Sequence, residues 1–162
     1  MLADKTGSLI ATAAEVGVMF SGAPQEYRPL VRAFGEQVGI AFQLVGDVID
    51  LSPTSEETGK LAGTDLRAGV VTLPLLYLRK LAETDPDAAV LLARIEPGTA
   101  TDDEAELTEA IASLREHEVT RATIAEARRW ANLAVASLDP LPEGPVKKAL
   151  TRFAESIVDR QG

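Results

Sequence analysis

The sequence has no cysteine, and aromatic residues make up only 4% of its 162 residues. Without cysteine there can be no disulfide, no thiolate metal site and no thiol catalysis, and the absence suits a cytoplasmic protein without establishing the compartment. The scarcity of aromatic residues favours helices, because strands draw on aromatic and β-branched side chains. The single histidine, His117, lies between two glutamates, which indicates a solvated side chain and excludes a histidine-based metal cluster.

The chain also lacks basic charge and long apolar runs. Its 25 acidic residues outnumber its 16 lysines and arginines, giving a net charge of −9. Because a nucleic-acid-binding protein needs a basic surface, we expect no nucleic-acid partner. No apolar run approaches the ~20 residues that cross a bilayer, so we expect no membrane span. Residues 5–14 weakly imitate a signal peptide, but Asp4 and Glu15 bracket that run and the helical pattern continues beyond it.

Abundant alanine and leucine and a repeating apolar pattern predict about seven helices and no strand. The expected helices cover residues 2–20, 25–51, 74–82, 86–95, 101–116, 124–138 and 146–157. Prolines and glycines indicate a loop over residues 52–69. Asp85 is expected to cap one helix, and Thr101 with Glu104 fits a capping box at the start of the next. Because no linker separates these helices, we expect an all-α bundle that packs as one unit over residues 1–162.

Four of these helices carry an apolar stripe. In each, apolar residues recur every three or four positions, which places them on one side of the helix, and we expect that side to be buried. The stripes are Leu2, Leu9, Ala13, Val16 and Phe20; Tyr27, Leu30, Phe34, Val38, Ala41, Val45 and Val48; Ile124, Ala127, Ala131, Val135 and Leu138; and Val146, Leu150, Phe153 and Ile157.

Three strongly polar residues interrupt the apolar segment VGIAFQLVGDVIDL, namely Gln43, Asp47 and Asp50. At ~100° per residue, these side chains share one face of a helix. A helix that is apolar nearly all round is buried, and two carboxylates on a buried face need a compensating partner. That partner can be a lysine or arginine, a shared proton or a hard cation such as Mg²⁺. A buried salt-bridge network, or a helix end that emerges into water at Asp50, explains the pattern equally well.

Two lysines stand where an anionic partner is expected. Lys5 lies between Leu2 and Leu9 on the stripe expected to face inward, where it needs an anion or a route to water. Thr6 adds a hydroxyl beside it, although a lysine snorkelling at a frayed N-terminus is the alternative. Lys60 lies in the glycine-rich stretch TGKLAGTDLRAG, where backbone can approach a ligand closely and a lysine suits a phosphate. The spacing is not that of a Walker A loop.

These features, in this order, resemble the trans-isoprenyl diphosphate synthases. The family's second aspartate-rich motif, FQ-x-x-D-D-x-x-D, matches residues 42–50. Its G-K-x-x-G-x-D-L stretch matches residues 59–66, and its T-L-P matches residues 72–74. Its K-T pair, one helix earlier, matches Lys5 and Thr6. The resemblance covers essentially the whole chain and implies the C-terminal half of the isoprenoid synthase fold, so that the chain would be one partial domain.

The resemblance implies a Mg²⁺-dependent prenyltransferase of isoprenoid biosynthesis. In the family, Mg²⁺ ions hold an allylic diphosphate between two aspartate-rich helices, and the metals and lysines stabilise the departing diphosphate as an allylic cation forms. The double bond of isopentenyl diphosphate attacks this cation, and a proton is then lost. The roles implied by the match are metal binding for Asp47 and Asp50, diphosphate binding for Lys5 and Lys60, and supporting polar contacts for Thr6 and Gln43.

Two departures from the family pattern bear on activity. Gly46 replaces the first aspartate of the second motif, which in the family is a principal metal contact. The first aspartate-rich motif is absent, because only four residues precede Lys5, and the acidic run at 102–104 has the chemistry of an ordinary helix start. We therefore expect an enzyme fragment that is inactive alone. The alternative is a naturally short, non-catalytic subunit that pairs with a complete synthase and modulates it.

Both hypotheses name the same classes of partner. The substrates would be an allylic diphosphate and isopentenyl diphosphate, and the rest of the fold would come from the missing N-terminal half or from a partner synthase subunit. Because the missing helices would cover part of the core, we expect an exposed apolar face and self-association into a homo-oligomer.

Overall fold

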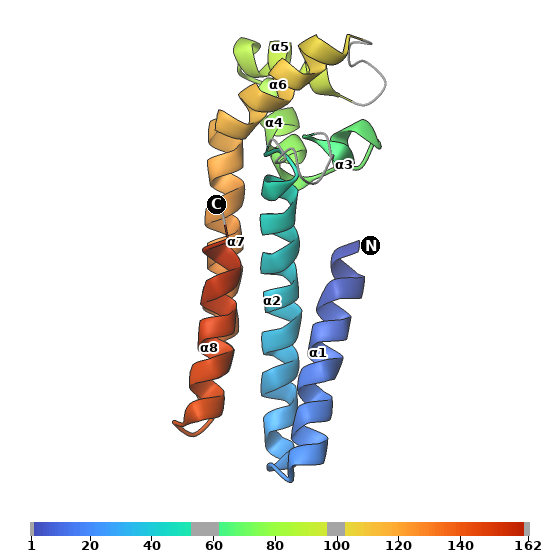
Figure 1. Cartoon of the computed structure of the whole chain (residues 1–162). Helices are drawn as coiled ribbons and strands as arrows, with labels where there is room; N and C mark the ends of the chain where they lie inside the picture. Colours follow the sequence, from blue (N-terminus) through green and yellow to red (C-terminus); the bar gives the residue numbers. More distant parts are fainter. Residues whose placement is uncertain (1, 53–61, 97–102, 161–162) are drawn as a thin grey trace. The chain divides into compact units, whose positions relative to one another are not determined.

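The computed structural model describes residues 2–52, 62–96 and 103–160, and in residues 2–4 it describes the backbone alone. Over these ranges the chain forms eight α-helices, one 3₁₀ helix and no strand (Figure 1), which confirms the all-α prediction. The elements are α1 (Leu2–Ser21), η1 (Gln25–Tyr27), α2 (Arg28–Ile49), α3 (Thr64–Arg67), α4 (Leu73–Ala82), α5 (Pro86–Ile95), α6 (Glu104–Glu116), α7 (Glu118–Ser137) and α8 (Pro145–Val158).

The chain forms two compact units. The first comprises Met1–Val45 with Ala125–Gly162, and the second comprises Gly46–Ile124. Helices α2 and α7 each contribute residues to both units. The assignment of the whole chain to one partial domain stays a prediction.

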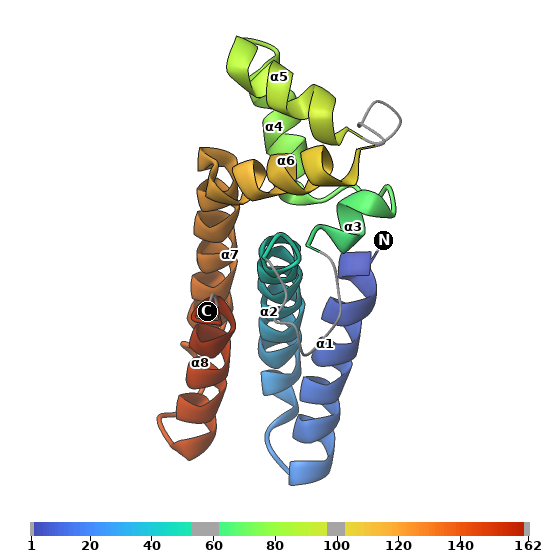
Figure 2. The same ribbon diagram turned by 45° about the horizontal axis from the view of Figure 1, so that its top comes forward.

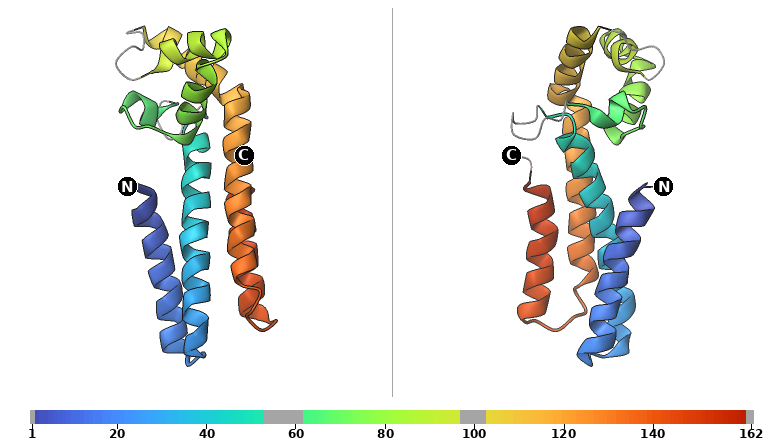
Figure 3. Two further views of the ribbon diagram at one scale, coloured as in Figure 1. Left: turned by 180° about the vertical axis from the view of Figure 1, so that it is seen from behind. Right: turned by 45° about the vertical axis from the view of Figure 1, so that its right-hand side comes forward.

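The core of the first unit forms where α2, α7 and α8 face one another. These helices and α1 lie side by side in both views of Figure 3. The buried core residues are Phe34, Val38, Ala41, Val45, Ala127, Ala131, Ala134, Leu138, Ala154, Ile157 and Val158. The stripe predicted for α2 is therefore confirmed from Phe34 onward, and that of α7 is confirmed at its three fully buried positions. Alanines supply most of the α7 surface in this core, which lets the helix backbones approach closely.

Helix α1 packs on α2 through small residues. An added Cβ at Gly39 would lie 2.3 Å from the Cα of Gly7, and one at Gly35 would lie 2.5 Å from the Cα of Ala11. Real Cβ atoms do not approach backbone this closely, so a larger residue at either α2 position would push the two helices apart. The two helix backbones are in direct contact along this seam.

The stripe predicted for α1 does not face the core. Leu9 is 69% exposed and Phe20 is 85% exposed, whereas Ala11 and Val18 are buried. At ~100° per residue, Ala11 and Val18 lie about 160–180° around the helix from Leu9. The periodicity found an apolar side of α1 correctly, but the side that packs on α2 is the opposite one, because only small residues allow the close contact described above.

The stripe predicted for α8 is half right. Ile157 is buried and Leu150 packs against the core, but Val146 and Phe153 are exposed. The core also contains Ala154 and Val158, which lie one position after Phe153 and Ile157 respectively. Most of the expected stripe therefore runs along the edge of the buried side.

The second unit is built from α3 to α6 and the adjoining ends of α2 and α7. Helix α5 packs against both α4 and α6, and Figure 2 shows these three helices grouped together. The buried core residues are Leu51, Leu66, Leu75, Leu78, Ala88, Leu91, Ile95, Ala110, Ile111, Leu114 and Val119. The short α3 falls inside the segment that was predicted to be a loop, because four residues give too little periodicity to recognise a helix.

The helix starts in this unit follow capping chemistry. Asp85 caps α5 as predicted, since its carboxylate accepts the backbone N–H groups of Asp87 and Ala88. The capping box at Thr101 is wrong: Asp103 caps α6, and its carboxylate accepts the N–H groups two and three residues ahead. Thr101 itself lies outside the described residues.

Candidate active site

Two of the predicted polar residues meet in the first unit. The side-chain amide of Gln43 on α2 donates a hydrogen bond to the Thr6 hydroxyl on α1, with 2.6 Å between Nε2 and Oγ1. Both side chains are half-buried. Lys5, the neighbour of Thr6, has an exposed side chain on α1. The segments that carry the K-T and F-Q motifs are therefore joined by a direct contact, although 37 residues separate Thr6 from Gln43.

Asp47, in the last turn of α2, holds the start of another helix. Its Oδ2 accepts the backbone N–H of Leu73, the first residue of α4, at 3.0 Å. The N-cap residue of α4, Thr72, makes no capping hydrogen bond with its own side chain. The carboxylate of Asp47 thus satisfies a backbone donor that a helix start leaves unpaired, and its negative charge lies at the positive end of the α4 dipole.

Asp50 accepts backbone hydrogen bonds from the segment at the start of α3. Its carboxylate Oδ2 accepts the backbone N–H of Asp65, in the first turn of α3, at 3.0 Å. Its main-chain carbonyl accepts the N–H of Gly63 at 2.7 Å. Gly63, with a φ of 72°, adopts the left-handed conformation that favours glycine. The G-x-D-L part of the matched motif is therefore held at the C-terminal end of α2.

The surroundings of Asp47 raise the pKa of its carboxyl group. Burial of the side chain raises the pKa of Asp47, the N–H of Leu73 acts in the opposite direction, and the nearby carboxylates of Asp65 and Asp50 raise it further. A raised pKa means that the folded chain disfavours the charged carboxylate, as expected where burial removes water and other acids lie nearby. Asp65 belongs to the matched motif, yet the sequence pattern predicts no role for it. Its position as the only acid in that stretch was the available signal.

The donor set fits Mg²⁺ in combination with a phosphate. Mg²⁺ is usually held by one or two carboxylates together with waters and phosphate oxygens, and not by a cage of protein ligands. Asp47 and Asp50 supply two carboxylates, and within the described ranges no group of three or more histidine, cysteine or acidic side chains forms a metal cage. The hydroxyl of Thr72, next to the contact between Leu73 and Asp47, is buried and finds no hydrogen-bond partner among the described residues. A bound ligand or water would satisfy that group.

Lys60 and Gly46 are the two remaining motif positions. Lys60 lies outside the described residues, so its role in binding diphosphate stays a prediction. Gly46 is exposed, and a Cβ added there would meet nothing within 4 Å. A larger residue could therefore occupy this position without a clash. The metal and diphosphate roles of the other residues also stay predictions.

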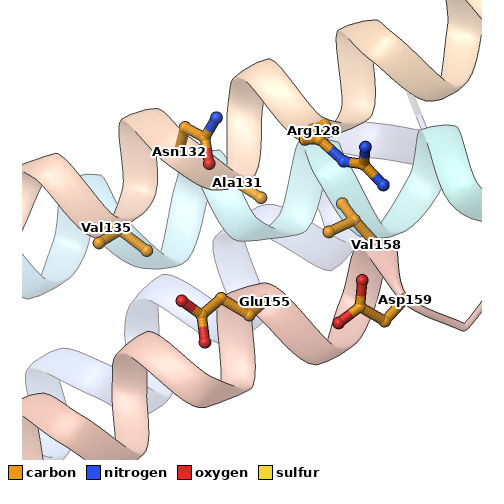
Figure 4. A pocket seen from close by; sticks show the side chains of 7 residues that line it. All are labelled: Arg128, Ala131, Asn132, Val135, Glu155, Val158 and Asp159. Carbon is orange, nitrogen blue, oxygen red and sulfur yellow. The ribbon is translucent and has the colours of Figure 1, made fainter.

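The cavities of the first unit lie away from these residues. A groove of about 320 Å³ lies between α7 and α8. Figure 4 shows Arg128 on one side of this groove and Glu155 and Asp159 on the other. A second, mostly apolar cavity of about 490 Å³ lies between the end of α1, the start of α2 and the segment leading into α8. None of the predicted site residues lines either cavity. Among the described helices, none combines the length and apolar character that crossing a membrane requires.

Comparisons with known proteins agree with the order of the motifs. Residues 1–114 match the family model described as polyprenyl synthetase. The nonaprenyl diphosphate synthase of Mycobacterium tuberculosis is 41% identical over 98% of this chain and 46% of its own length. The heptaprenyl diphosphate synthase component 2 of Geobacillus stearothermophilus is 33% identical over 96% of this chain and 47% of its own length.

Solved structures give the same result. The geranylgeranyl pyrophosphate synthase of Corynebacterium glutamicum, in complex with calcium and isoprenyl diphosphate, has 36% identity and a TM-score of 0.79 over 99% of this chain and 49% of its own. The polyprenyl synthase of Caulobacter crescentus, in complex with the same ligands, has 32% identity and a TM-score of 0.83 over 99% of this chain and 48% of its own.

The chain spans about half the length of the curated relatives that it matches. The shared segment covers about half of their all-α fold, and its place in the C-terminal half stays a prediction from the motifs. Sequence identity and fold similarity extend over nearly the whole of this chain. The chain belongs to the polyprenyl synthetase family.

Proposed function

We propose that this chain supplies the C-terminal half of an isoprenyl diphosphate synthase active site, in which isopentenyl diphosphate condenses with an allylic diphosphate. The observation that carries the proposal is the hydrogen bond from Gln43 to Thr6, because it brings two polar motifs from separate helices to one place. A half-buried amide and hydroxyl contribute little to a core, whereas a site that binds polar ligands needs them in fixed positions.

The proposed roles follow from the chemistry of each side chain. The exposed ammonium group of Lys5 attracts a diphosphate as a point charge. The Thr6 oxygen accepts the bond from Gln43, so the hydroxyl hydrogen can donate to an anionic ligand. Asp47 and Asp50 are the residues that would hold Mg²⁺. When bound, the metal would supply positive charge that stabilises the departing diphosphate.

Activity is expected only when the other half of the fold is present. Ionisation of an allylic diphosphate needs cations held from both sides, and this chain offers one side with a glycine at position 46. The test compares the 162-residue chain with a fusion protein in which the part of the M. tuberculosis relative preceding its matched stretch is joined to Met1. Labelled isopentenyl diphosphate should enter extractable prenyl product only in the fusion protein. Robust incorporation by the chain alone would refute the fragment hypothesis.

A second candidate function is a non-catalytic subunit that modulates a complete synthase. Two observations favour it: the relatives from Geobacillus stearothermophilus and Bacillus subtilis are named as component 2 of a heptaprenyl diphosphate synthase, and Gly46 removes one acid of the motif. If this function is correct, the fusion protein should stay inactive, while the chain should change the rate or product length of a complete synthase added in trans. The DNA upstream of Met1 also separates the two, since an in-frame first aspartate-rich motif favours the enzyme.

The glycine at position 46 gives a direct test of the metal assignment. Because an added side chain meets open space, Gly46→Asp should fold and place a third carboxylate beside Asp47. In the fusion protein this change should strengthen Mg²⁺-dependent binding of inorganic pyrophosphate, measured by calorimetry. Gly17→Asp, an equally open position on α1, is the charge-matched control. Equal binding in both variants would contradict the assigned site. A homo-oligomeric state and a cytoplasmic location stay predictions.

A further inference from the structure

Helix α1 has two apolar sides that face in opposite directions. One side packs on α2 through small residues such as Gly7 and Ala11. The other carries Leu9, Ala13, Val16 and Phe20, here called the outer strip. At ~100° per residue, Leu9, Val16 and Phe20 point within about 40° of one another. All four residues of the outer strip are exposed.

This arrangement is the reverse of an ordinary surface helix. A surface helix turns its large apolar side chains inward and leaves polar ones outside. In α1 Leu9 and Phe20 point away from α2 and are 69% and 85% exposed, whereas the buried side carries the smaller residues Gly7, Ala11 and Val18. In Figure 1 and in the left view of Figure 3, no other described helix of the first unit lies beyond α1 on the side away from α2. A helix of this composition is suited to the middle of a bundle, with partners on both sides.

We propose that the outer strip is the docking surface for the helices of the N-terminal half of a prenyl synthase, the half that this chain does not span. The inference rests on the proposed function, and it adds which surface of the chain meets the missing half. Its support is the length of the relatives, because the chain covers 46% and 47% of two of them. Lys5 lies on the same side of α1 as Leu9, so this surface would also bring the proposed diphosphate-binding lysine to the junction of the two halves.

The absence of cysteine allows a clean test. Leu9→Cys and Phe20→Cys each introduce a single thiol into the outer strip, and Val146→Cys introduces one at a comparably exposed position of α8, 69% exposed against 69% for Leu9. Each variant is made in the 162-residue chain and in the fusion protein with the N-terminal part of the M. tuberculosis relative. The rate of maleimide labelling is then measured for each thiol in both proteins.

We expect both outer-strip thiols to react at least about tenfold more slowly in the fusion protein than in the chain alone, because burial restricts access of the reagent. The Val146→Cys thiol should react at a similar rate in both. Equal labelling of the outer strip in the two proteins would overturn the proposal. Protection of the outer strip in the chain alone, together with a dimer in light scattering, would also overturn it and would identify a second copy of the chain as the occupant.

A second experiment supplies the two halves as separate chains. The tagged 162-residue chain and the N-terminal part of the M. tuberculosis relative are produced together and purified through the tag. We expect co-purification to be lost in Leu9→Glu and kept in Val90→Glu, a charge-matched control 65% exposed on α5. Loss in both variants, or in neither, would contradict docking at the outer strip. Prenyl product formation is recorded separately, so that docking without activity refutes the proposed function alone.

Discussion

The contact between α1 and α2 predicts a large effect from adding a single methyl group. In Gly39→Ala, the new Cβ would lie 2.3 Å from the Cα of Gly7 and 2.8 Å from its backbone nitrogen, whereas ordinary contact begins at 3.4 Å. Both opposing atoms belong to a helix backbone, so no side chain can rotate to make room. The two helices must separate by about an ångström along the seam, which loosens every contact between them.

Two opposing terms set the magnitude. Replacing glycine by alanine in a helix interior favours the helix by about 1 kcal/mol. Overpacking costs typically about 1–3 kcal/mol, and here it falls at the upper end because the clash involves backbone. We expect Gly39→Ala to lower the free energy of unfolding by about 1–2 kcal/mol after both terms are counted. That is a substantial part of the ~5–15 kcal/mol that holds a typical domain together.

The assay is urea denaturation followed by far-ultraviolet circular dichroism, with the fluorescence of the single tryptophan, Trp130, as a second probe in the first unit. The matched control is Gly17→Ala on α1, where the added Cβ meets nothing within 4 Å. This control should gain up to about 1 kcal/mol, because only helix propensity acts. If Gly39→Ala proves as stable as Gly17→Ala, the close packing of these helices is wrong.

The remaining predictions concern hydrogen bonds and charges. Burial raises the pKa of Asp47, so ionisation of this carboxylate costs stability as the pH rises through its folded-state pKa. With a chelator present, Asp47→Asn should therefore stabilise the chain at pH 7, and the difference should fade in acid, where Asp47 is protonated in both the folded and the unfolded chain. Glu126→Gln should behave oppositely in the same pH series, because a hydrogen bond from Arg129 lowers the pKa of Glu126 and the stabilisation is lost in acid. Asp103→Ala should cost about 1 kcal/mol in thermal unfolding by removing the cap of α6, and Asp103→Ser should recover most of it. Thr6→Val should cost about 1 kcal/mol in urea by leaving the half-buried amide of its partner unpaired.

Periodicity predicted the fold well wherever one side of a helix packs and the other meets water. Helix α2 is the clearest case, since its stripe from Phe34 to Val45 contributes to the core of the first unit. Helix α1 shows the limit of the method. Its large apolar residues define a side, yet the chain alone packs the opposite side because Gly39 and Gly35 admit backbone contact there. A pattern of large residues cannot reveal a seam made of glycine.

The site was predictable as a set of residues but not as a set of contacts. Helical spacing placed Gln43 and Asp47 on one side of α2, but nothing in a period of 3.6 residues indicates which distant group each one meets. Gln43 bonds to Thr6, 37 residues earlier, and Asp47 bonds to Leu73, 26 residues later. Such pairings depend on which distant segments the tertiary fold brings next to α2, and helical periodicity does not contain that information.

The contacts of the two acids change how the proposed function should be tested. The carboxylate of Asp47 accepts a backbone N–H at the start of α4, and that of Asp50 accepts one at the start of α3. Both carboxylates therefore have a structural role in the fold as well as the proposed metal-binding role. Loss of activity in Asp47→Ala would therefore follow from a misplaced α4 as readily as from a lost metal ligand. Lys5 has no such role, because its side chain is exposed. A change there leaves the core untouched and removes only the charge.

Lys5→Gln in the fusion protein is therefore the sharper test of the chemistry. If Lys5 binds diphosphate, this variant should keep the thermal stability and the Mg²⁺ response of the parent fusion. Its affinity for inorganic pyrophosphate should fall by about tenfold, the effect of losing one charge-assisted hydrogen bond, and turnover should fall with it. Lys148→Gln, at an exposed lysine of α8, removes the same charge elsewhere in the first unit and should leave both quantities unchanged. Equal effects of the two substitutions would mean that net charge alone attracts the ligand and that Lys5 holds no specific position in the site.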